Sequence, residues 1–220
     1  MNLNRRQLLI AAAATPLVGA QAAHAQARRD PQAGKEYAAL KNPQPVENPA
    51  KIEVLDFFQY SCPHCFHFLP MLVDWHKKLP GDVQYRYLPC VFDERTTPHA
   101  KICYALEALG KIDELHLKVF NAFHVDHKKL LDTNEIADFM AANGIDRDKW
   151  LSMFNSFAVA TKVSRAGQVW RAYEIDGTPS LGCDGKYVTS PSMVQSEVAS
   201  LQVMDFLIDK ARQERAGKKS

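Results

Sequence analysis

Two cysteines separated by two residues stand where a predicted strand meets a predicted helix. Residues 52–58 are mostly apolar and β-prone, which is typical of a buried strand. Over residues 63–78, apolar side chains recur every three or four positions, as on one face of an amphipathic helix. Cys62 and Cys65 therefore lie at the first turn of that helix, and Pro63 occupies a position that helices tolerate. The fold must contain a strand that leads directly into a helix starting at a cysteine.

The spacing of Cys62 and Cys65 is typical of a redox-active disulfide. Unpaired N–H groups and the positive pole at a helix start favour a thiolate on Cys62, by roughly one pKa unit. His64, with its ring beside the sulfur, would add a positive charge or an N–H donor. A stabilised thiolate favours the dithiol over the disulfide, by about 30 mV for each pKa unit. The Pro63–His64 pair between the cysteines therefore predicts an oxidant rather than a reductant.

Two other interpretations of the Cys62–Cys65 pair are a static disulfide and half of a zinc site. A zinc site needs two further ligands, and His124 and His127 are the only closely paired candidates. They fall in a separate helical region, so we expect no metal, and nothing in the sequence calls for a cofactor.

Asp56 interrupts the apolar strand that leads to the cysteines. A buried carboxylate is costly unless it is paired or protonated, so we predict a raised pKa and proton relay to Cys65. The alternative is an exposed strand position.

The segment Gly177-Thr178-Pro179 precedes the short strand predicted at residues 180–183. Within a sheet, proline is normally confined to an edge strand or to the first position of a strand. The sequence alone leaves both the cis and the trans peptide open.

Helical periodicity dominates the chain between residues 97 and 172. The order of predicted elements is strand, helix, strand, helical block, strand, strand, helix, which indicates an α/β fold. We predict one domain from residues 26–96 and 173–220, with residues 97–172 inserted as an all-helical domain. The predicted helices of the block span 98–109, 113–123, 135–142, 147–155 and 158–172; the remaining elements are strands at 35–40, 83–90, 180–183 and 187–189 and a helix at 194–212.

Three further cysteines lie beyond the active-site motif. Cys90 and Cys103 could form a second disulfide, but two buried free thiols are the interpretation that we favour. Cys183, in a late predicted strand, is expected to be a core residue. The other histidines, His67, His76, His99 and His116, are interpreted as surface or packing residues.

The first 25 residues have the order of a secretory signal peptide. A short basic region with Arg5 and Arg6 is followed by an apolar stretch and a small-x-small site ending at Ala25. We predict cleavage after Ala25, with Ala22 and Ala27 as alternative positions, and export to the periplasm by the Sec or the twin-arginine route. The formal net charge of the chain is only +2. We therefore expect no nucleic-acid-binding surface.

The sequence resembles the DsbA family of periplasmic disulfide oxidases. The resemblance rests on residues 54–58 leading into Cys62-Pro63-His64-Cys65, on the helical block, and on Gly177-Thr178-Pro179 followed by residues 184–187. It implies a thioredoxin-like fold, a central mixed sheet flanked by helices, with an inserted helical domain. It also implies that Cys62 is the sulfur that attacks and is attacked in thiol–disulfide exchange, and that Cys65 is the resolving thiol. Asp56 would take the place of the buried acidic residue of the family. Pro179 would be a cis-proline near the disulfide, and Thr178 would pair with substrate peptide.

The implied partners are reduced, unfolded exported proteins and a DsbB-type membrane quinone reductase that restores the disulfide. The chain is expected to be a monomer. It departs from the family in its extra cysteines and in Leu69-Pro70, where an acidic residue is often found. The competing functions are a disulfide isomerase or reductase, although no dimerisation module is visible, and a peptide-binding module that merely retains the motif.

Overall fold

The computed structural model describes residues 29–217, and the predicted signal peptide lies outside the described residues. A five-stranded mixed sheet with the order β1-β5-β4-β2-β3 forms the centre. β2 and β3 are parallel, whereas the β2–β4, β4–β5 and β1–β5 pairs are antiparallel. The strands are β1 (Ala38–Ala39), β2 (Ile52–Phe58), β3 (Val83–Pro89), β4 (Ser180–Cys183) and β5 (Tyr187–Thr189).

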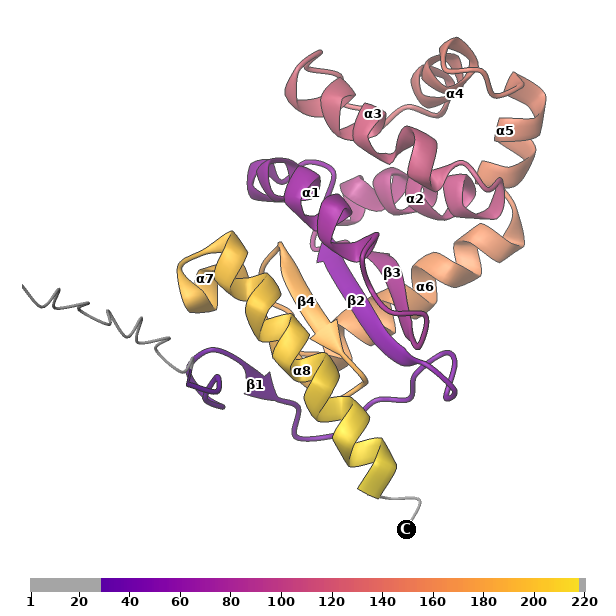
Figure 1. Ribbon diagram of the computed structural model, residues 1–220. Coiled ribbons are helices and arrows are strands. Elements are labelled where there is room, and N and C mark those ends of the chain that lie inside the picture. Colours follow the sequence, from indigo (N-terminus) through magenta and orange to yellow (C-terminus); the bar gives the residue numbers. More distant parts are fainter. Residues whose placement is uncertain (1–28, 218–220) are drawn as a thin grey trace, which may run out of the picture.

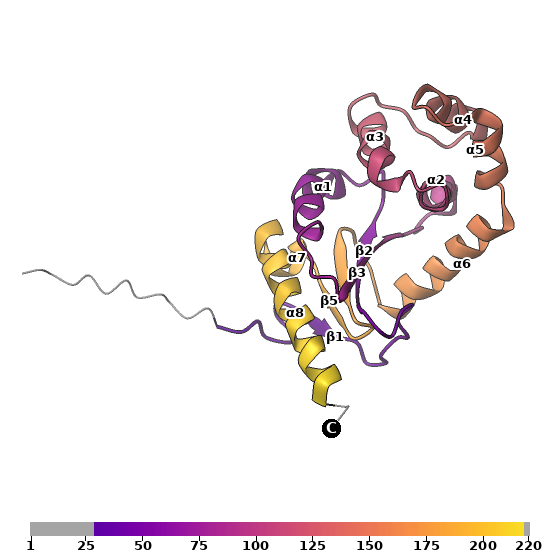
Figure 2. The ribbon, with the colours of Figure 1, turned by 45° about the vertical axis from the view of Figure 1, so that its right-hand side comes forward.

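Helices cover both faces of this sheet. In Figure 2, α8 and α1 lie on one side of the strands and α6 on the other, with the remaining helices of the block above. The helices are α1 (Pro63–His76), α2 (Thr97–Ala108), α3 (Ile112–His124), α4 (Thr133–Ala142), α5 (Arg147–Phe154), α6 (Phe157–Ala172), α7 (Pro191–Val194) and α8 (Glu197–Gly217), with a 3₁₀ turn at Glu94–Thr96. Among residues 29–217, no helix combines the length and apolar character needed to cross a membrane.

β2 is buried along its whole length, and its side chains point alternately into two separate hydrophobic cores. Ile52 and Val54 face the core between the sheet and helices α1 and α8, together with Leu72 and Leu207. Leu55, on the opposite face, belongs to a larger core that extends into the helical block. Asp56 continues the alternation of Ile52 and Val54, which places its carboxylate beneath α1.

The helical block and the sheet share the larger core. Phe58 and Tyr60, at the end of β2, belong to the same buried cluster as Val119 and Phe120 of α3 and Trp150 of α5. In Figure 1 helices α2 to α5 of the block lie above the sheet next to α1, and α6, the last helix of the block, returns the chain to the sheet. The helices α2–α6 lie within residues 97–172, but the division of the chain into two domains stays a prediction.

Most predicted elements appear where the sequence placed them. β2, β4 and β5 have the predicted bounds, and the five helices of the block differ by one or two residues at their ends. Asp132 caps α4 by accepting hydrogen bonds from the backbone N–H groups of Asn134 and Glu135. β1 is shorter than predicted. The short helix α7 and the 3₁₀ turn were missed because each is too brief to show periodicity.

Candidate active site

Cys62 is the N-cap residue of α1, directly after the turn that ends β2. Pro63 occupies the first helical turn, and the backbone N–H of Cys65 donates to the Cys62 Sγ at 3.4 Å. The first turn of α1 contains no acidic residue. The free N–H groups of the helix start therefore face the sulfur, as the sequence predicted.

A second segment, far away in the sequence, meets Cys62 from the other side. The Thr178–Pro179 peptide is cis, and it leads into β4 beside β2. The Cys62 Sγ lies 3.3 Å from the Thr178 carbonyl oxygen and, when it carries its proton, donates to that oxygen. The structure thus brings together Cys62, Thr178 and Pro179, three residues that the sequence linked only through the family resemblance.

The surroundings of Cys62 favour its thiolate. Hydrogen bonds, first from the Cys65 thiol and then from the Cys65 backbone, the Thr178 side chain and the His64 backbone, lower the pKa of Cys62 to about 5 against the opposing effect of burial. His64 therefore contributes its backbone N–H at the sulfur. Its ring is exposed and lines a groove beside the dithiol.

The pKa of Cys65 is shifted in the opposite direction to that of Cys62. Cys65 is buried, with 4% of its surface exposed, and burial raises the pKa of its thiol far above the usual range. The structure holds the pair as a dithiol, with both sulfurs free. One sulfur of the pair is therefore suited to be an anion and the other to carry a proton.

Asp56 lies behind Cys65 and is only 2% exposed. Burial raises the pKa of Asp56 to about 7, although the Tyr85 hydroxyl, which donates to Oδ2 at 2.8 Å, partly offsets this. The alternative of an exposed strand position is therefore wrong. Tyr85 was missed as a site residue, but Tyr85 pairs with Val54, two residues before Asp56, and therefore lies on the same face of the sheet as Asp56.

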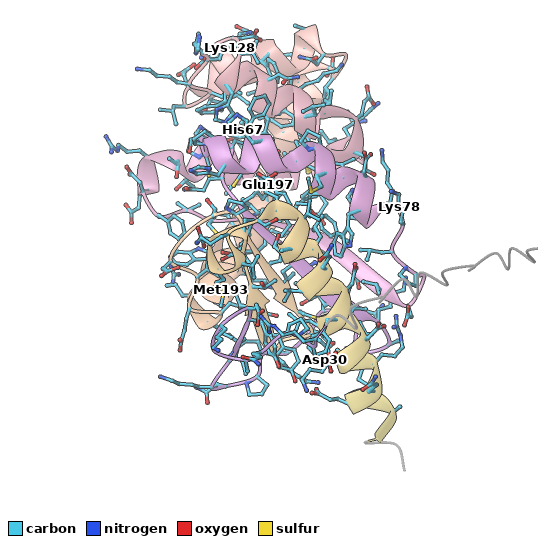
Figure 3. The ribbon with its side chains drawn as sticks, turned by 60° about the vertical axis from the view of Figure 1, so that its left-hand side comes forward. Asp30, His67, Lys78, Lys128, Met193 and Glu197 are labelled. Carbon is cyan, nitrogen blue, oxygen red and sulfur yellow. The ribbon has the colours of Figure 1, made fainter. Side chains whose placement is uncertain are left out.

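A groove with a volume of about 700 Å³ opens beside the dithiol. It lies between the start of α1, the cis-proline loop and the α7–α8 connection. Figure 3 shows Glu197 at the start of α8 close to α1, and Met193 of α7 farther from α1. The residues that line the groove are His64, Met71, Gly177, Thr178, Pro179, Pro191, Ser192, Gln195, Ser196, Glu197 and Val198.

Tyr60, two residues before Cys62, is fixed by two histidines of α3. Its hydroxyl is 2.8 Å from the buried His116 Nδ1, and its carbonyl oxygen is 2.8 Å from the His124 Nε2. The His124 ring also stacks on Phe66 at 4.8 Å. The interpretation of His116 as a packing residue missed this polar pair, because partners 56 positions apart leave no trace in local periodicity.

The remaining thiols are buried and lie apart from the groove. Cys90, Cys103 and Cys183 are free, and burial raises the pKa of each. For Cys90 and Cys103 this agrees with the interpretation as two buried free thiols rather than a second disulfide. Within residues 29–217, no group of three or more Cys, His, Asp or Glu side chains is arranged to hold a metal ion.

A thioredoxin-like core with a helix-capping dithiol next to a cis-proline defines a class of protein, the thiol:disulfide oxidoreductases. The comparisons agree with this class and give the family. The family model of the DSBA-like thioredoxin domain matches residues 53–200. The chain belongs to this family, and it is a periplasmic thiol:disulfide oxidoreductase.

Relatives of this chain include the thiol:disulfide interchange proteins DsbA of Pseudomonas aeruginosa and Burkholderia cepacia. The first is 40% identical over 183 residues, which are 83% of this chain and 87% of the relative. The second is 37% identical over 186 residues, or 84% and 88% of the two chains. The crystal structure of Pseudomonas aeruginosa DsbA matches with a TM-score of 0.80 at 40% identity, covering 86% of this chain and 97% of that one. The thioredoxin-like fold is thereby confirmed.

Proposed function

We propose that the chain oxidises reduced, newly exported proteins by donating the Cys62–Cys65 disulfide. A substrate thiolate attacks the Cys62 sulfur, and the bond between Cys62 and Cys65 breaks. The electron pair of that bond stays on Cys65, which takes up a proton. A second substrate thiolate then attacks the substrate sulfur of the mixed disulfide. The substrate leaves with a disulfide, and Cys62 leaves as a thiolate.

The contrast between the two thiols carries this proposal. The pKa of Cys62 is lowered to about 5, so at neutral pH it is the better leaving group when the second substrate thiol attacks. The pKa of Cys65 is raised, so it keeps its proton and does not return to attack the mixed disulfide. Both properties favour release of an oxidised substrate.

Asp56 is the proton donor and acceptor for Cys65 in this mechanism. Its pKa of about 7 allows it to hold a proton or to lose it under neutral conditions. It gives a proton when Cys65 is released as a thiolate, and it takes the proton back when the disulfide is restored.

Thr178 and Pro179 form the substrate-binding edge of the site. The backbone of Thr178 lies next to Cys62, with its carbonyl oxygen 3.3 Å from Sγ, so an extended substrate peptide can pair with it beside the reactive sulfur. The neighbouring groove, with Met71 and Val198 among its apolar residues, would hold side chains of the substrate. Pro63 and His64 complete the rim between the groove and the sulfur.

A DsbB-type membrane quinone reductase is the proposed partner that reoxidises the dithiol. In this proposal the chain acts as a monomer and reaches the periplasm through a signal peptide cleaved after Ala25. The relatives support a general system of substrate proteins and reoxidising partner, since they share the family and most of the chain length.

Oxidative refolding of a reduced protein by the purified mature chain tests the proposal. The redox equilibrium of the Cys62–Cys65 pair with glutathione is recorded in the same experiment. We expect rapid oxidation and an equilibrium in which glutathione readily reduces the pair. A pair that stays oxidised in millimolar glutathione would instead indicate a static disulfide, and reshuffling of wrong disulfides without net oxidation would indicate an isomerase.

A further inference from the structure

A small cavity lies directly behind the dithiol. Its volume is about 10 Å³, which is close to the space that a single water molecule needs. Three polar residues line it, Cys65, Asp56 and His116, from three different elements. The rest of its wall is apolar and consists of Phe58, Phe68, Leu69, Leu72, Phe120 and Pro179.

Two of the polar side chains each leave one atom without a partner. Asp56 uses Oδ2 for the Tyr85 hydroxyl, and His116 uses Nδ1 for Tyr60, whereas Asp56 Oδ1 and His116 Nε2 contact no donor or acceptor within residues 29–217. Both residues are almost completely buried, with 2% and 3% of their surfaces exposed. Buried polar atoms are nearly always satisfied by protein or by ordered water.

The Tyr60 hydroxyl determines which nitrogen of His116 carries a proton. Burial holds the pKa of His116 near 3 and raises that of Tyr60, so the ring is neutral and the hydroxyl keeps its hydrogen. His116 Nδ1 is the only acceptor that this hydroxyl contacts in the described part of the chain. Nδ1 must therefore be unprotonated, and Nε2 is a buried N–H donor next to the cavity.

We infer that the cavity is a binding site for one water molecule, and that His116 is the residue that positions it between Asp56 and Cys65. The Nε2–H of His116 donates to the oxygen of the water. While Asp56 is a carboxylate, the two hydrogens of the water point to Asp56 Oδ1 and the Cys65 sulfur. When Asp56 is an acid, its Oδ1–H donates to the water oxygen instead and one hydrogen of the water remains for the Cys65 sulfur, so three polar partners hold the water in both states. The inference rests on the proposed roles of Cys65 and Asp56 and adds His116 to them.

The water completes the proton transfer that accompanies disulfide donation. When Cys65 leaves as a thiolate, the water gives it one hydrogen and receives the proton of the Asp56 carboxylic acid. The products are the Cys65 thiol, the Asp56 carboxylate and an unchanged water molecule. His116 loses and gains no proton, since its part is to hold the water in place.

The tautomer of His116 and the water can each be observed directly in the wild-type chain. Nitrogen NMR of the reduced chain with labelled histidine should show a neutral His116 with its proton on Nε2. A high-resolution crystal structure of the same form should contain a water within hydrogen-bond reach of Asp56 and His116. A proton on Nδ1, or a cavity that stays empty, would overturn the inference whatever the activity of the enzyme.

A kinetic experiment tests the effect of His116 on proton transfer. The rate at which dithiothreitol reduces the Cys62–Cys65 disulfide is measured as a function of pH for wild type, His116→Phe, His116→Gln and Asp56→Asn. We expect His116→Phe to slow reduction about tenfold, the effect of losing one hydrogen bond, where Asp56 carries its proton. At high pH, where Asp56 cannot donate, the two rates should converge. His116→Gln, with an amide donor, should recover part of the rate.

Other ionisable groups surround the cavity, and a control variant accounts for them. Burial raises the pKa of the tyrosines and of the cysteines other than Cys62, so these groups keep their protons during the experiment. His76 of α1 is therefore the neighbour that needs a control. His76→Gln should leave the pH profile of the reduction rate unchanged. The ionisable groups that act on Asp56 or His116 through charge or a hydrogen bond are Tyr60, His76, Tyr85, Tyr87, Cys90 and Cys103, Cys65 lines the same cavity, and Asp113 acts in turn on His76 and Tyr87.

The variants separate failure of this inference from failure of the proposed function. If Asp56→Asn slows reduction and His116→Phe does not, the positioning by His116 is wrong and the role of Asp56 stands. If neither variant slows reduction at low pH, the proposed proton transfer from Asp56 is wrong as well. A slowing by His116→Phe that is the same at every pH would indicate a merely structural role and overturn the inference.

Discussion

The two cysteines of the active site and two cysteines of the core lie in different surroundings, and their chemistry differs. At the start of α1, Cys62 and Cys65 share a hydrogen bond, and N–H groups and Thr178 favour the Cys62 thiolate. At the end of β3 and inside α2, Cys90 and Cys103 lie in the apolar core, where burial raises the pKa of both. The same side chain is therefore reactive or inert according to the donors around it and its distance from water.

Replacement of one cysteine at each place is the strongest test of this contrast. Cys62→Ser should lower the rate of substrate oxidation about 10³-fold or more, because no other thiol can form the mixed disulfide. Cys103→Ala should keep the oxidase activity and lose only ~1–2 kcal/mol of stability from the cavity that it leaves. Refolding assays and denaturant unfolding measure the two effects. A folded Cys103→Ala variant without activity would contradict the comparison.

The titration of the thiols sharpens the same contrast. In the reduced chain, ultraviolet absorbance should report one thiolate that forms with a midpoint near pH 5, which is the pKa of Cys62. Alkylation below about pH 8 should label Cys62 alone, because burial keeps the other thiols protonated. Such a depressed pKa stabilises the dithiol form by ~60 mV at neutral pH. Labelling of Cys90 or Cys103 in the folded chain would show that burial does not protect them.

A smaller effect concerns Asp56, the carboxylate behind the reactive pair. Its pKa is about 7 in the folded chain, against an ordinary value of 3.8 for an aspartate in water, so the unfolded chain ionises first as the pH rises. The stability that Asp56 provides is fully present below about pH 4 and is lost progressively up to about pH 7, by up to ~4 kcal/mol.

Asp56→Asn should remove this loss, so that the variant is more stable than wild type at pH 8 by a few kcal/mol. Urea unfolding of the reduced proteins between pH 4 and pH 8 measures the difference. Asp74→Asn, on the exposed side of α1, is the matched control and should follow wild type. If the free energy of unfolding depends on pH in the same way for Asp56→Asn and wild type, the pKa of Asp56 is not raised in the folded chain.

The smallest effect is expected at Thr178. Its side chain is one of several donors to the Cys62 sulfur, so Thr178→Val should raise the pKa of Cys62 by less than about one unit. Thr178→Ser keeps the hydroxyl and should leave the titration of Cys62 unchanged. A large rise in both variants would assign the effect to the backbone of the cis-proline loop.

Much of the site could be predicted because it is local in the sequence. The strand, the Cys-Pro-His-Cys turn and the helix form one continuous segment, and Asp56 lies six residues before Cys62 on a mostly apolar strand. The thiolate-stabilising helix start follows from these residues alone. Thr178 and Pro179 needed the family resemblance, since nothing local to them indicates that they meet Cys62.

The contacts across the molecule could not be predicted. Tyr85 reaches Asp56 only through the register of β2 and β3, and Tyr60 reaches His116 only because α3 packs against the end of β2. Each partner is an ordinary aromatic or polar residue in its own segment. Their importance arises from tertiary packing, which a single sequence does not display.

The attachment of Tyr60 to α3 has a consequence for any chimaera built from this chain. Grafting the Cys-Pro-His-Cys turn onto another scaffold would carry Tyr60 along but leave His116 and His124 behind. The Tyr60 hydroxyl and carbonyl would then lose both of their ring-nitrogen partners. We expect a transplanted motif to recover the oxidising character of the parent only when α3 is moved with it.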